Sequence, residues 1–175
     1  MVEVNFGVQP GFNSTQLLDM NWNRFVEIMD NAPSTLDIII FAESTLNSML
    51  TAPELPEIAE KISPCDDENY VEGNLAKKIS CAAKQHQRYV VINLTTKAKC
   101  PDVDMIAQND TRNCTRADGF SYYNTNVVFD RNGVVISRYR KYNLFGESVD
   151  KPFKPTMVTF DTDFGVKFGH FICFD

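Results

Sequence analysis

Two short apolar runs and the segment between them constrain the fold most strongly. Residues 36–42 and 88–94 are rich in Ile and Val, too short and too β-branched for helices, and therefore predict buried strands. Residues 73–87 lie between them and carry apolar residues at helical spacing. A strand, a helix and a second strand predict a βαβ unit with a parallel pair of strands. We therefore expect an α/β fold.

A β-hairpin is the clearest local prediction. Residues 122–129 and 134–139 read as strands, and the Asn132–Gly133 dipeptide between them supplies the positive φ angles of a tight turn. Alternation along the second strand sends Arg138 and Arg140 to one face and Lys141 to the other.

The remaining elements follow from apolar spacing and from helix and turn signals. A helix is predicted to start at Ser14 or Thr15, which can cap it, and to stop before Pro33. Residues 51–72 and 95–120 are polar and predict loops. A short strand is expected at 157–160, and residues 165–175 predict a buried strand near whose end Cys173 lies.

Composition excludes several classes of protein. The 175 residues suit one domain, and 43% hydrophobic with 11% aromatic residues suffice for a core. A net charge of −6 with scattered basic residues argues against a nucleic-acid partner. The apolar runs are too short to cross a membrane, and residues 1–7 are no signal peptide. Two histidines, His86 and His170, do not make a metal site.

Cysteines and glycosylation sequons nevertheless suggest a secreted protein whose signal peptide lies outside this chain. Four cysteines lie in or beside polar stretches and allow three connectivities. We favour Cys65–Cys81 and Cys100–Cys114, because each pair brackets one local segment. Cys173 is then an odd and potentially reactive thiol, whereas five reduced cysteines in a cytosolic protein remain the alternative. Four sequons, where composition would give about two, mark candidate glycosylation sites at Asn13, Asn93, Asn109 and Asn113.

Glu43, Lys141 and Cys173 each lie at or just after a predicted strand end, where the sites of α/β sheets form. Each has a plainer interpretation. Cys173 is a small buried hydrophobe, Glu43 starts a loop or a helix, and Lys141 belongs to a basic surface patch.

Three segments together resemble the three signatures of the nitrilase superfamily: Phe41–Glu43, Arg140–Glu147 and Phe171–Asp175. The resemblance is greatest to the biotinidase/vanin branch of carbon–nitrogen hydrolases. The hairpin segment Asn124–Asp130, the sequons and the loop cysteines suit this secreted branch. Three motifs in order at suitable spacing favour the resemblance over the three plainer interpretations.

The resemblance implies a Cys-Glu-Lys triad that needs no cofactor or metal. Cys173 is the implied nucleophile, and a nearby Lys141 ammonium favours its thiolate. Glu43 is the implied general base, and Lys141 with a backbone N–H near Cys173 holds the oxyanion. Glu147 matches a second glutamate of the family, which we expect to position the site.

The implied fold is a four-layer αββα arrangement, of α/β or α+β sandwich type. Residues 1–175 match a partial carbon–nitrogen hydrolase domain whose C-terminal part is missing. We expect the fold to need its own C-terminal part or a second subunit, and the isolated chain to fold poorly. A cooperative melt of that chain together with amidase turnover would refute this expectation.

The implied function is hydrolysis of small linear amides, of pantetheinase or biotinidase type, through a thioester, in a protein that is secreted or anchored outside the cell. Alternatives are another nitrilase-type amidase, such as a carbamoylase or ω-amidase, and a non-catalytic secreted binding protein or inactive fragment. The sequons and paired cysteines argue against the mostly cytosolic carbamoylases and ω-amidases.

Overall fold

A four-stranded sheet forms the centre of the molecule in the computed structural model, which describes residues 10–112, 114–173 and 175. The strand order is β1-β2-β3-β4, with β1 parallel to β2 and the other neighbours antiparallel. The predicted parallel pair and hairpin are therefore confirmed. The strands are β1 (Ile38–Ile40), β2 (Tyr89–Lys99), β3 (Phe120–Phe129) and β4 (Val135–Arg140).

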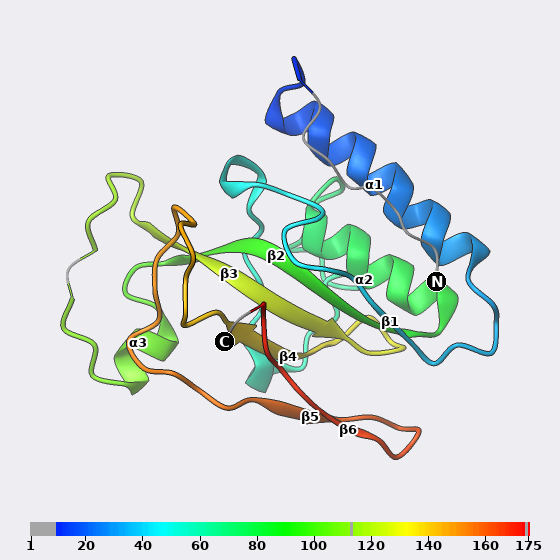
Figure 1. Ribbon diagram of the computed structural model, residues 1–175. Coiled ribbons are helices and arrows are strands. Elements are labelled where there is room, and N and C mark those ends of the chain that lie inside the picture. The colour runs from blue at the N-terminus through cyan, green and yellow to red at the C-terminus, as the bar shows by residue number, and fades with distance from the viewer. Residues whose placement is uncertain (1–9, 113, 174) are drawn as a thin grey trace.

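Helices α1 (Ser14–Asn31) and α2 (Leu75–His86) lie on one face of this sheet (Figure 1). Asn13 caps α1 through its side chain, which accepts a hydrogen bond from the N–H of Gln16, so the predicted cap at Ser14 or Thr15 was one or two residues late. The apolar faces of both helices bury a common core against alternate residues of the strands. The fully buried centre of this core contains Phe25, Ile79, Val90, Ile92, Leu94, Val127 and Phe129.

A hairpin of β5 (Thr159–Asp161) and β6 (Lys167–Gly169) lies across the other face (Figure 1). Phe160 packs there on Tyr89, Val91 and Val128. The described chain thus has a helix layer, a four-stranded sheet and a small second sheet. The prediction of a buried strand over 165–175 was wrong in extent, because β6 is three residues long and Phe171 beyond it is 73% exposed.

The polar segment 95–120 is more regular than expected. β2 continues to Lys99 because β3 pairs with it along its whole length, which satisfies the backbone of these polar residues. A short helix, α3 (Val103–Ala107), follows. Two 3₁₀ turns accompany the predicted loop 51–72. One, η1 (Met49–Thr51), overlaps the first residue of this loop, and the other, η2 (Ile58–Glu60), lies inside it.

Disulfides join Cys65 to Cys81 and Cys100 to Cys114, which confirms the pairing favoured from the sequence. Cys173 is a free thiol. Within the described ranges, no helix is long and apolar enough to cross a membrane.

Candidate active site

The side chains of Glu43, Lys141 and Glu147 meet at one point on the sheet. The Lys141 ammonium donates to Glu43 Oε1 at 2.8 Å and to Glu147 Oε1 at 2.6 Å. The Lys141 side chain is only 2% exposed, whereas the two carboxylates are 27% and 23% exposed. A buried ammonium therefore lies beneath two partly exposed carboxylates, so the plainer interpretation of Lys141 as part of a basic surface patch was wrong. Glu43 does begin a turn after β1, but its carboxylate is held by the Lys141 ammonium.

Strand ends position Glu43 and Lys141, whereas Glu147 lies in the loop after β4. Glu43 follows β1 at its C-terminal end, and Lys141 directly follows β4. The backbone N–H of Lys141 donates to the carbonyl of Asn124 on β3 at 2.8 Å, which continues the ladder by one residue. Alternation then turns Lys141 inward, as the sequence predicted, while Arg138 and Arg140 form ion pairs on the opposite face.

Charge pairing shifts the pKa values of the cluster. Burial alone would lower the pKa of Lys141, but its hydrogen bonds to Glu147 and Glu43 outweigh burial and raise that pKa above its usual value. Burial would raise the pKa of Glu147, but the hydrogen bond from Lys141 and backbone N–H groups, including that of Phe145, lower it to about 2. Lys141 is therefore charged and Glu147 ionised at neutral pH.

Two asparagines of the sheet, Asn93 and Asn124, complete the cluster, and neither was predicted to belong to the site. Asn124 Nδ2 donates to Glu43 Oε1 at 2.7 Å and lies 3.2 Å from Glu147 Oε1. Asn93 on β2 donates from Nδ2 to Asn124 Oδ1 at 2.6 Å. Asparagine is depleted in strands, and a buried amide needs partners, so two asparagines inside apolar strand runs were the available signal.

The prediction that Asn93 is a glycosylation site was wrong. It is 2% exposed and its amide nitrogen is hydrogen-bonded inside the sheet, so the folded chain has no room for a glycan there. Asn13 and Asn109 are exposed and remain predictions. Asn113 lies outside the described residues.

Cys173 lies on the segment after β6, and that segment is bonded to the same face of the sheet. Asn126 on β3 donates to the carbonyl of Phe171 at 3.3 Å, and Asp175 accepts from the N–H of Asn143 at 3.1 Å. Cys173 is exposed, with a left-handed φ of 53°, so it is not the small buried hydrophobe of the plainer interpretation. Among the hydrogen bonds of the described residues, none joins Cys173 to Glu43 or Lys141.

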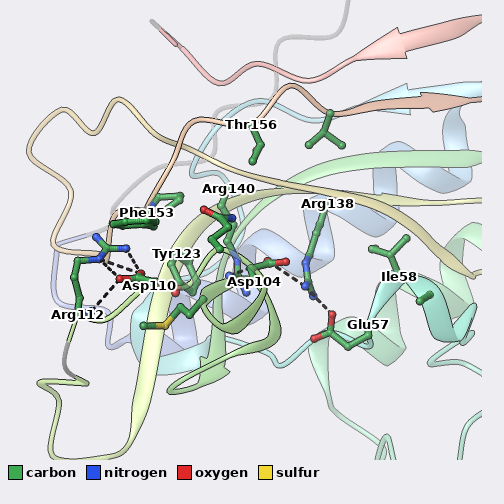
Figure 2. Close-up of a pocket in the computed structure, with 15 residues that line it drawn as sticks. Glu57, Ile58, Asp104, Asp110, Arg112, Tyr123, Arg138, Arg140, Phe153 and Thr156 are labelled. Carbon is green, nitrogen blue, oxygen red and sulfur yellow. Dashed lines mark hydrogen bonds and ion pairs between the residues drawn. The ribbon is translucent and has the colours of Figure 1, made fainter.

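A cavity of about 280 Å³ lies on the opposite face of the sheet (Figure 2). Tyr123 lines it, and because consecutive strand residues point to opposite faces, Asn124 points away from it. Figure 2 shows the ion pairs of Arg112 with Asp110 and of Arg138 with Glu57 among its lining residues. None of the four residues predicted for the triad and its support lines this cavity.

The carbon–nitrogen hydrolase family matches residues 9–175 of the chain. Vanin-like protein 1 of Drosophila melanogaster is 51% identical over 86% of the chain and 27% of its own length. Human biotinidase is 31% identical over 91% of the chain and 30% of its own length. Mouse pantetheinase is 39% identical over 70% of the chain and 23% of its own length. The chain thus spans less than a third of the length of each of these relatives.

Among solved structures, an amidase from Nesterenkonia sp. AN1 matches with a TM-score of 0.54 at 12% identity, over 89% of this chain and 50% of that one. This likeness supports the fold alone. The chain belongs to the carbon–nitrogen hydrolase family, within the nitrilase superfamily. Its relatives place it in the branch of vanin-like proteins, pantetheinases and biotinidases, which confirms the resemblance found in the sequence.

Proposed function

We propose that the protein containing this chain hydrolyses small linear amides, with Cys173 as nucleophile, Glu43 as general base and Lys141 as oxyanion donor. The buried Lys141 ammonium between two carboxylates is the observation that carries the proposal. Burial of paired charges is costly, and such clusters concentrate at functional sites. The named activities of the pantetheinase and biotinidase relatives favour an amide of that kind as substrate.

The proposed reaction has two halves. Glu43 takes the thiol proton as the Cys173 sulfur attacks the amide carbon, and Lys141 with a backbone N–H near Cys173 stabilises the oxyanion. The C–N bond then breaks, Glu43 gives its proton to the leaving amine, and a thioester remains on Cys173. Glu43 next deprotonates water, which attacks the thioester. The acid leaves, and the proton returns to the Cys173 sulfur.

The two glutamates divide the work in this scheme. The low pKa of Glu147 keeps it ionised throughout the reaction, so it balances the Lys141 charge while Glu43 carries the proton.

Two further observations are in keeping with the role of Cys173. It has a left-handed backbone, a strained conformation that clusters at active sites. A Glu→Gln mutant of the Nesterenkonia amidase, which has this fold, shows covalent addition of the acetamide moiety of fluoroacetamide at its active-site cysteine.

The two disulfides support a location in an oxidising compartment, and we propose that the protein acts outside the cell. Residues 1–175 then form part of one hydrolase domain that the rest of the protein, or a second subunit, completes. Two exposed apolar side chains close in sequence to the site residues, Ile40 at 62% and Phe171 at 73%, are in keeping with such a covering.

Alkylation kinetics of the full-length protein test the proposed chemistry. Cys173 should react with iodoacetamide at pH 7 many times faster than free cysteine, and Glu43→Gln should slow that reaction. Glu57→Gln is the matched control, because Glu57 also pairs with a largely covered cation, Arg138, but on the opposite face. Alkylation of Cys173 at the rate of free cysteine would overturn the proposal.

A further inference from the structure

Two carboxylates converge on one cation in this site, and a second group must help to hold them there. Glu43 Oε1 and Glu147 Oε1 both accept from Lys141 Nζ, and Asn124 Nδ2 is hydrogen-bonded to the same two oxygens. An amide nitrogen has two N–H groups, one for each carboxylate. One positive charge balances only one of the two negative charges, so these neutral donors offset the remaining repulsion.

The orientation of the Asn124 amide is fixed from both ends. The backbone N–H of Ser44 donates to Asn93 Oδ1 at 2.8 Å, and a backbone N–H can only donate. Asn93 Nδ2 must therefore face Asn124 Oδ1, and Asn124 Nδ2 must face the carboxylates, which when ionised can only accept. Every donor in the series Ser44, Asn93, Asn124 points toward the glutamates.

This series also closes a ring on Glu43. It starts at the Glu43 carboxylate and returns, through the two asparagines, to the backbone of the next residue, Ser44. Ser44 has a left-handed φ of 54°, and its hydrogen bond to Asn93 holds that turn. The ring fixes the Glu43 carboxylate relative to its own main chain. Asn93 and Asn124 are 2% and 5% exposed, which leaves little room for other rotamers.

We propose that Asn124 is a positioning residue that holds the carboxylates of Glu43 and Glu147 in their converged arrangement, and that Asn93 fixes the amide of Asn124 in the donating orientation. This inference rests on the proposed function for its readout. Glu43 is faced by Lys141 and, through it, by Glu147. Further titratable groups among the described residues of this face include Cys173, Asp175, His170, Tyr139 and Tyr89.

The test is the pH dependence of kcat/KM for the full-length protein with a pantetheine or biotinyl amide substrate. Asn124→Asp keeps the shape of the side chain, and its Oδ1 still accepts from Asn93. The Nδ2 donor, however, is replaced by a carboxylate oxygen that faces the carboxylates of Glu43 and Glu147. Like charges raise the pKa of neighbouring carboxyls. We expect the acidic limb of the profile to move up by at least one pH unit and kcat/KM at pH 7 to fall at least tenfold.

Asn93→Asp provides a second, indirect variant. It still accepts from Ser44 but no longer donates to Asn124, whose amide should then flip, and the acidic limb should move in the same direction by less. Thr125→Val is the matched control. It removes a buried hydrogen bond of 2.7 Å to Thr96 on the opposite face of the same strands and should leave the profile in place.

An acidic limb unchanged in both aspartate variants, or moved equally by Thr125→Val, would overturn the inference. Different results would refute the proposed function itself. These are a wild-type protein that cleaves neither the pantetheine nor the biotinyl amide, or a Cys173→Ala variant that keeps the wild-type activity.

Discussion

Glu147 should stabilise the folded protein in a pH-dependent way, and Glu147→Gln tests this. The substitution keeps the size of the side chain but removes one of the two negative charges that pair with the buried Lys141 ammonium. Burial would raise the pKa of Glu147, but Lys141 and the backbone N–H groups lower it from 4.5 to about 2. The ionised form is therefore bound more strongly in the folded state than in the unfolded state.

A pKa shift of this size corresponds to roughly 3 kcal/mol of stability. The Glu147 side chain is 23% exposed, so solvent weakens the interaction, and we expect a loss of about 2 kcal/mol at pH 7. Because the folded-state pKa is depressed, this contribution is complete above about pH 4.5 and disappears as the pH falls toward 2. The wild-type protein and the variant should therefore converge in stability at low pH.

Urea unfolding of the full-length protein at a series of pH values from 7 to 3 measures the difference. By pH 3 the difference should have fallen below about half of its value at pH 7. Glu72→Gln is the control, because that side chain is 93% exposed beside Lys77 and should have little effect at any pH. Equal stability of wild type and Glu147→Gln at pH 7, or a difference that stays constant with pH, would refute the reasoning.

Two further substitutions test the site and the hairpin. Lys141→Met removes the proposed oxyanion donor and should lower kcat/KM for amide hydrolysis by about a thousandfold, whereas a loss of less than tenfold would argue against that role. Gly133→Ala should lower the thermal stability far more than Gly119→Ala. Both glycines have positive φ, 76° and 74°, but only at Gly133 would a Cβ meet a backbone oxygen, that of Ser80, at 2.5 Å. Equal losses in the two glycine variants would contradict this.

Local patterns were sufficient to predict the parts of the fold whose residues pair with near neighbours. The Asn132–Gly133 dipeptide predicted the hairpin because glycine readily adopts the positive φ of such a turn. Only Gly133 has that angle, 76°, so the expectation was wrong for Asn132. Alternation predicted that Lys141 turns inward, because the strand keeps its pleat to that residue. The disulfide pairs followed from the local segments that they bracket.

Interactions across the sheet were beyond the sequence patterns. The segment 165–175 has strand-forming residues, but β6 pairs only with the short β5 in the described chain, so its apolar residues do not form the buried strand expected. Lys97 lies in β2 rather than in a loop because it pairs with Tyr122 on β3. Asn93 and Asn124 are 31 residues apart, and only the register of β2 with β3 brings their amides together.

The most direct test of the central claim is peptide mapping by mass spectrometry after the full-length Glu43→Gln variant has been incubated with fluoroacetamide. Glu43→Gln removes the proton transfers that lead to hydrolysis of the amide, so the Cys173 sulfur can instead displace fluoride, which leaves with the thiol proton, and form a thioether that persists. The account predicts a covalent addition on the peptide that contains Cys173, and none after Cys173→Ala. An addition on a different residue, or no addition while the wild-type protein hydrolyses amides, would contradict the assignment of Cys173 and Glu43.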